Sequence, residues 1–262
     1  MAGVGSASVL QRYRVLRVLA VLGQEPGPAH ARLAVAMGLG PVPPAGEYAE
    51  VMEHQCPPYG GHYLGQPPSA GVVDHLCSLL FFYAGLSEGG DREDRPGFLM
   101  ERLASWAPAC LAAVAEVGHP WYWAWAGLVR EALVEEVAEL GPAHRLPRCL
   151  REAPPPLGTG GDVLGALSCP ARSGLVLTPA RVAALAAELD RPGPGGLGGL
   201  LAREPGGTLE LLALEARTWV ERHRAWGVPA GGVAGWWAGR AARTAEVLEA
   251  LAEACPTGHS WL

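Results

Sequence analysis

The chain has 262 residues, of which 49% are hydrophobic and 18% charged, a composition typical of globular proteins that excludes a disordered chain. Its formal net charge is -6, and all 20 basic residues are arginine. This acidic balance argues against nonspecific nucleic-acid binding, which needs clustered positive charge.

The N-terminal stretch is partly apolar, but Arg12, Arg14 and Arg17 interrupt it, and no small-residue cleavage site follows an apolar run. No export signal is therefore predicted. No window approaches 18 uninterrupted apolar residues, so neither a transmembrane helix nor stable membrane insertion is expected. The six cysteines are scattered singly, which favours buried thiols over a disulfide framework. The sequence thus predicts a soluble, cytoplasmic protein.

The spacing of apolar residues predicts an all-α fold. They recur at i, i+3 and i+4 along most of the chain, and no window rich in β-branched residues alternates with period two. The first helices are expected over about 8–23, 29–38 and 46–54, each ended by a glycine- or proline-rich break.

The stretch CPPYGGHYLGQPPSAGVVDHL, residues 56–76, is rich in proline and glycine, which disfavour a regular element. We expect an ordered loop, held by packed helices on both sides, of the kind that carries binding sites. It contains these candidate side chains: Tyr59, His62, Tyr63, Asp74 and His75.

A helix over about 74–87 follows, apolar nearly all round and therefore expected at the centre of a bundle. The polar stretch SEGGDREDRPG is predicted to be a surface loop. The next helix, over about 98–117, is expected to be kinked or split by Pro108. Another is predicted over 120–140, with proline at its first position.

Beyond about Gly141 a proline-rich stretch indicates a linker, and a second, smaller helical layer follows. Two regions are predicted: 1–150 as a helical core, and 151–262 as a helical extension packing on it. Within the extension a glycine-rich turn, RPGPGGLGG, separates two shorter helices from two longer ones, expected over about 162–167, 178–189, 208–226 and 233–254.

The adjacent Asp74 and His75 have three interpretations. The acid can complement a helix dipole beside a packed imidazole, the two can form a pair that titrates near neutral pH, or they can anchor a peptide. A metal site would gather His54, Cys56 and His62 with this pair, but the spacing H-x-C-x5-H matches no compact zinc knuckle. No metal and no cofactor are therefore predicted.

The sequence contains no motif for catalysis. It lacks GxSxG, a phosphate-cradling loop between strand and helix, and paired carboxylates placed by a motif, so an enzyme is not predicted. The runs WYWAW at 121–125 and WW at 236–237 are typical of a core or of an interface. A plain interaction scaffold and a metal-dependent helical enzyme are the alternatives to the interpretation that follows.

Four segments in order resemble the cytoplasmic TorD/DmsD/NarJ-like chaperones that assemble molybdopterin oxidoreductases. They are CPPYGGHYL, VVDHL before an apolar helix, FLMERLASWAPACLAAV, and GHPWYWAWAGLVREALVEE. The resemblance covers about 12–140 and is strongest over 47–136. It implies a single helical bundle of the TorD-like type, to which this chain adds a C-terminal helical extension.

The resemblance also implies a function and a site. Members bind the twin-arginine signal peptide or N-terminal region of a partner oxidoreductase subunit and hold it until the molybdenum cofactor is inserted. A monomer or homodimer with no cofactor of its own is expected. The implied peptide-binding residues are those of the family's Asp-His motif, its aromatic loop and its His-Pro-aromatic-Tyr element: Tyr59, Tyr63, Asp74, His75, His119, Pro120, Trp121 and Tyr122.

The chemistry of such a peptide also agrees with residues of this chain, independently of the resemblance. A signal peptide has a polar, arginine-bearing start and an apolar core, so its receptor needs acidic groups for the guanidinium beside an apolar, aromatic groove. The residues proposed to supply charge and apolar surface are Asp74, Glu47, Glu50 and Glu53, with Trp121, Tyr122, Phe81 and Phe82.

Overall fold

The fold is all-α, as predicted, with most of the described residues in helices. The computed structural model describes residues 4–65, 74–88, 93–141, 145–158, 160–191, 195–226 and 232–255, and these include no strand. Parts of the predicted loops therefore lie outside the described residues, at 66–73, 89–92, 142–144 and 192–194. No single helix in the described ranges has the length and apolarity to span a membrane, although one bent pair, 94–104 with 107–116, meets that test by length and composition.

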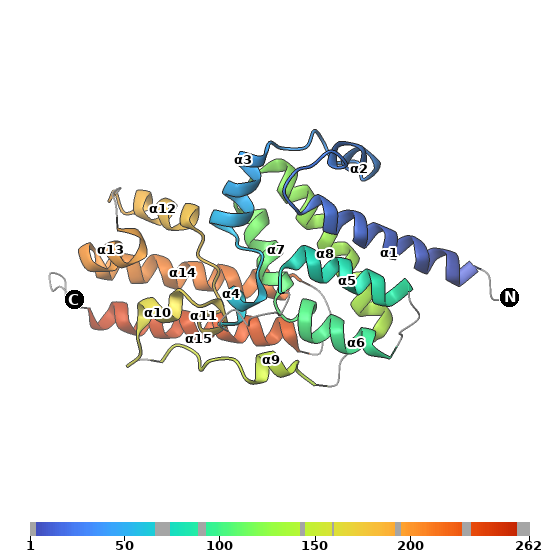
Figure 1. The fold of residues 1–262 in the computed structure, drawn as a ribbon. Helices are drawn as coiled ribbons and strands as arrows, with labels where there is room; N and C mark the ends of the chain where they lie inside the picture. The colour runs from blue at the N-terminus through green and yellow to red at the C-terminus, as the bar shows by residue number, and fades with distance from the viewer. Residues whose placement is uncertain are drawn as a thin grey trace.

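The first part of the chain forms a layer in which α1 packs along α5 and across α8, while α7 packs on α8 (Figure 1). Two π-helical segments, η1 and η2, continue α3 and α6. The bounds are α1 Val4–Leu22, α2 His30–Ala36, α3 Ala45–Tyr48, η1 Ala49–Gln55, α4 Gly60–Leu64, α5 Leu76–Glu88, α6 Asp94–Phe98, η2 Leu99–Ala104, α7 Ala107–Glu116 and α8 Pro120–Leu140.

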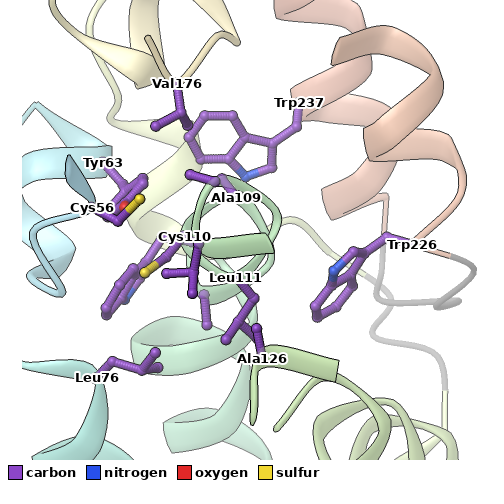
Figure 2. Packing of buried hydrophobic residues seen from close by; sticks show 14 of the residues in the cluster. Cys56, Tyr63, Leu76, Ala109, Cys110, Leu111, Ala126, Val176, Trp226 and Trp237 are labelled. Atoms are coloured by element: carbon purple, nitrogen blue, oxygen red, sulfur yellow. The ribbon is translucent and has the colours of Figure 1, made fainter. Parts of the chain in front are cut away.

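The centre of the molecule is α7 rather than α5. Figure 2 shows Ala109, Cys110 and Leu111 of α7 lying between Tyr63 on one side and Trp237 on the other. The prediction that α5 is buried all round is wrong. One face of α5 packs on α1 and η2, whereas Phe81 and Phe82 on the opposite face are 49% and 57% exposed.

Three stretches predicted as loops contain helices. The proline-rich loop holds α4, the polar stretch ends in α6, and the glycine-rich turn runs into α13. In α6 the guanidinium of Arg95 is buried against Glu136 of α8, so this part of the polar stretch is not a solvated loop. The polar composition predicted a surface loop wrongly, because an ion pair with a distant residue determines whether the Arg95 charge is buried.

The rest of the chain is dominated by α14 and α15, which lie side by side, with shorter helices on their flanks (Figure 1). The predicted linker packs through its own helix, α9, and buries Leu150 and Leu157. The bounds are α9 Arg148–Arg151, α10 Val163–Leu167, α11 Pro170–Ser173, α12 Pro179–Glu188, α13 Gly196–Arg203, α14 Pro205–Arg224 and α15 Val233–Ala254.

The later helices join the earlier ones through specific contacts. The Trp237 indole donates to the Ser105 carbonyl at 2.8 Å. Gly174 has φ +75°, and a Cβ there would collide with backbone atoms of Ala241, so only glycine lets α11 approach α15 so closely. One hydrophobic cluster runs from Tyr13 to Leu248. The division at residue 150 stays a prediction.

Candidate functional site

The backbone around Asp74 and His75 pairs with the segment before α4. The Gly60 N–H donates to the Asp74 carbonyl at 3.0 Å, and the Leu76 N–H donates to the Pro58 carbonyl at 2.8 Å. These bonds form an isolated antiparallel bridge between Tyr59 and His75. The two ends of the predicted loop are therefore fixed against each other at the start of α5.

Both side chains of the pair are engaged at helix starts. The Asp74 carboxylate accepts the Gly61 N–H at 3.0 Å and so caps α4, and His75 Nδ1 accepts the Cys77 N–H at 3.1 Å in the first turn of α5. The neutral ring of His75 then carries its proton on Nε2. Burial lowers the pKa of His75, with the Asp74 charge acting in the opposite direction.

Asp74→Ala is expected to destabilise the protein by about 1 kcal/mol, because the Gly61 N–H loses its acceptor. Asp74→Asn keeps an acceptor oxygen and is expected to cost less. Urea unfolding of the two variants checks this, and equal stability of Asp74→Ala and the wild type would contradict the cap. A binding test that uses Asp74→Ala needs this stability measurement beside it.

The two tyrosines of the aromatic loop face different ways. Tyr59 is 48% exposed, and its ring meets that of His75 edge-on at 5.2 Å. Tyr63 is fully buried and stacks on Trp106 at 5.4 Å. Tyr59 is thus available to a ligand in this structure, whereas Tyr63 supports the loop from the core.

The predicted His119–Tyr122 element likewise has accessible residues and buried ones. His119 Nε2 lies 2.8 Å from the half-exposed carboxylate of Glu47, and Pro120 is exposed at the first position of α8. Trp121 and Tyr122 are buried, and the Trp121 indole donates to the Gly40 carbonyl at 3.2 Å. The last two therefore anchor α8 and offer no open surface.

Tyr48 connects the two parts of the predicted site, and the sequence pattern did not single it out. Burial is the largest cause that raises the pKa of Tyr48 to about 12, and the nearby Cys77, Glu53, Tyr59 and Glu25 raise it further. Tyr48 in turn helps to raise the pKa of Tyr122, after the burial of that residue. The one feature of the sequence that could have indicated Tyr48 is its position as an aromatic residue next to Glu47.

Acidic groups lie near Tyr48 and Tyr122, and one face of α5 exposes apolar side chains. Glu25 and Glu53 lie exposed near Tyr48, and Glu47 lies near Tyr122. On α5, Ser78, Phe81, Phe82 and Gly85 share one face at i, i+3, i+4 and i+7 and are at least partly exposed. The Arg17 guanidinium covers the Phe81 ring at 5.3 Å.

The five candidate metal ligands do not assemble. Within the described ranges, no three His, Cys, Asp or Glu side chains lie close enough to hold a metal ion. Cys56 is buried, and burial raises the pKa of its thiol, which disfavours the thiolate that a metal needs. His54 Nδ1 lies 3.0 Å from the Ala49 carbonyl of its own helix, and burial lowers the pKa of His62.

The runs of tryptophan are mostly structural. Trp125 and Trp237 are buried, and the Trp125 indole donates to the Leu19 carbonyl at 2.9 Å. Trp123 is the exception at 61% exposed. It lines an open groove between α7, α8 and α14 with a volume of about 370 Å³.

A scan against models of known protein families and searches of curated proteins and solved structures found no match. The four segments that resemble the TorD-like chaperones fall in α4, at the start of α5, in η2 with α7, and in α8. Three of the proposed binding residues in them, Tyr63, Trp121 and Tyr122, are buried.

Proposed function

We propose that this chain is an assembly chaperone of the TorD-like type. In this proposal it binds the twin-arginine signal peptide or N-terminal region of a molybdopterin oxidoreductase subunit and holds that segment until the cofactor is inserted. The supporting observation is that the exposed carboxylates of Glu53 and Glu25 and the half-exposed ring of Tyr59 all lie near Tyr48, next to Glu47 in the chain, whose carboxylate pairs with His119.

The two kinds of group have different tasks. An exposed ion pair contributes about 0.2–1 kcal/mol, whereas full burial of one Leu or Phe side chain contributes about 1.5–3 kcal/mol. The carboxylates therefore select a guanidinium and set the register of the peptide, and apolar contacts supply most of the affinity. The receptor consequently needs apolar surface within reach of the acidic end.

Removal of two acidic charges is expected to weaken leader binding about tenfold, at roughly 0.7 kcal/mol per charge. The variant is Glu47→Gln with Glu53→Gln, both exposed. Isothermal titration with a synthetic leader carrying two arginines and a leucine-rich core measures the change. Glu131→Gln with Glu135→Gln, exposed on α8, is the matched control, since it removes the same charge elsewhere.

A second titration separates leader recognition from a general scaffold. A precursor subunit with its leader is expected to bind, and the same subunit with the leader deleted is expected to bind far more weakly. Equal binding of the two forms would favour the scaffold alternative. An equal loss of leader affinity in the acidic-site variant and in its control would contradict the site assignment. It would not contradict the proposal that the chain binds the leader.

A further inference from the structure

The helix that begins at α3 changes its winding at Ala49, where the π-helical segment η1 starts. The Cys56 N–H donates to the Val51 carbonyl, five residues earlier, at 3.0 Å. A π-helix brings residues five apart into neighbouring turns, whereas an α-helix does so for residues three or four apart. Such π-helical turns are rare and occur frequently at functional sites. In η1 this winding brings the side chain of Gln55 to that of Glu50.

Gln55 connects the exposed carboxylate of Glu50 to the C-terminal region. Its amide nitrogen donates to Glu50 Oε1 at 2.6 Å, and its amide oxygen accepts the Ala180 N–H at 2.8 Å. The two partners fix the orientation of the amide, because a carboxylate only accepts and a backbone N–H only donates. Figure 1 shows α12 beside the helix formed by α3 and η1. One side chain thus joins segments that are 125 residues apart.

The α12 end of this connection is itself held in place. Ala180 lies in the first turn of α12, where backbone N–H groups have no acceptor within the helix. The Thr178 hydroxyl accepts the Arg181 N–H at 3.1 Å and caps the same turn. The Arg181 guanidinium donates to Glu215 of α14 at 2.8 Å, and the Glu215 side chain is only 3% exposed. Gln55 is therefore bound to a helix start that is fastened to α14.

Glu50 lies one helical turn from Glu47. The two residues stand at i and i+3 on the continuous helix of α3 and η1, which places their Cβ atoms about 5–6 Å apart. Both residues are exposed, and each carboxylate is held at one oxygen, Glu47 by His119 at 2.8 Å and Glu50 by Gln55 at 2.6 Å. A carboxylate has about four lone-pair sites, so each can still accept a guanidinium. A side chain that is already oriented loses less entropy on binding.

We infer that Gln55 is a positioning residue for one of the two leader arginines. It holds Glu50 in the orientation that accepts the guanidinium, while Glu47 accepts the other arginine. The inference rests on the proposed function and adds Glu50 to the site. It also gives the C-terminal region a part in leader binding, because α12 supplies the N–H that fixes Gln55.

Gln55→Met tests the inference, because it keeps the length of the side chain and removes both hydrogen bonds. Thr178→Val is the matched control, since it removes one hydrogen-bond acceptor from the same helix start and leaves Gln55 and Glu50 in place. Urea unfolding checks that both variants fold and measures how much stability each one loses.

The probes are two synthetic leaders that differ only in carrying two adjacent arginines or two glutamines, and isothermal titration measures their affinities. Gln55→Met is expected to weaken binding of the arginine leader about threefold, through the cost of ordering the Glu50 side chain on binding. Thr178→Val is expected to bind like the wild type. In a Glu50→Gln background, Gln55→Met is expected to have no further effect. The glutamine leader is expected to be indifferent to Gln55→Met.

Three outcomes overturn the inference and leave the proposed function standing. The first is arginine-leader binding that is unchanged in Gln55→Met. The second is an equal loss of affinity in Gln55→Met and Thr178→Val, since Gln55 would then only support the start of α12. The third is a loss that persists in the Glu50→Gln background. Failure of the wild type to bind the arginine leader overturns the proposed function together with the inference.

Discussion

Arg95→Met is expected to destabilise the protein by about 3–5 kcal/mol, because it leaves a carboxylate buried without its cation. The Glu136 side chain is 1% exposed and that of Arg95 8%. Glu136 Oε2 accepts from Arg95 Nη2 at 3.1 Å and from the Tyr83 hydroxyl at 2.7 Å. The guanidinium also lies over the rings of Tyr13 and Tyr83, at 5.0 and 5.9 Å.

Urea unfolding measures this effect, since urea does not screen charges as a guanidinium salt does. The double variant Arg95→Met with Glu136→Leu is expected to recover much of the loss, because no unpaired charge then remains. Arg224→Met breaks an exposed pair with Glu221 and is expected to cost below about 0.5 kcal/mol. Equal costs for Arg95→Met and Arg224→Met would contradict the buried network.

Acidification from pH 6.5 to 4 is expected to remove about 3 kcal/mol of stability through His223 alone. Burial lowers the pKa of this histidine from 6.5 to about 4, with smaller effects from the Gly174 carbonyl, which raises it, and from Arg222. Its Nε2 donates to that carbonyl at 2.8 Å, and its ring packs between Trp219 and Trp237. The native state thus keeps the ring neutral.

The direction in which stability changes with pH follows from the proton uptake of His223 in the unfolded chain. Between pH 6.5 and 4 the unfolded chain binds a proton at His223 and the native state does not, so stability falls as the pH falls. Above 6.5 both states are neutral, and below 4 both are protonated, so the contribution of His223 is constant outside this window.

Comparison with His223→Gln isolates this contribution, because other titrating groups act in both proteins. Glutamine keeps an N–H donor for the Gly174 carbonyl but does not titrate. Urea unfolding at several pH values is expected to show a loss about 3 kcal/mol larger in the wild type than in the variant across the window. Parallel pH profiles would contradict the assignment.

Much of the fold could be predicted because helix starts are specified locally. Pro120 occupies the first turn of α8 as predicted, and the Thr178 hydroxyl caps α12 by accepting the Arg181 N–H at 3.1 Å. The split of the predicted 98–117 helix is confirmed, with Pro108 in the first turn of α7. These signals depend on residues within one turn of each other, which the sequence displays directly.

Which of the candidate site residues are accessible could not be predicted from the sequence. Tyr59 and Tyr63 stand four residues apart in one loop, yet one is 48% exposed and the other fully buried. Phe81 and Phe82 lie on the open face of a helix that is apolar nearly all round, so periodicity could not separate its outer face from its inner one. Only the packing of α1 and η2 on the other side makes that distinction.

Local propensity and spacing were enough to predict the all-α class and many of the helix starts. Which aromatic residues are accessible, the burial of Arg95 and the contact between Glu47 and His119 depend on helix packing. The same packing brings Trp226 to the groove beside α7 and α8. Those features bring together residues that are tens of positions apart in the sequence. Such contacts depend on how helices pack against each other and not on the residues adjacent in sequence.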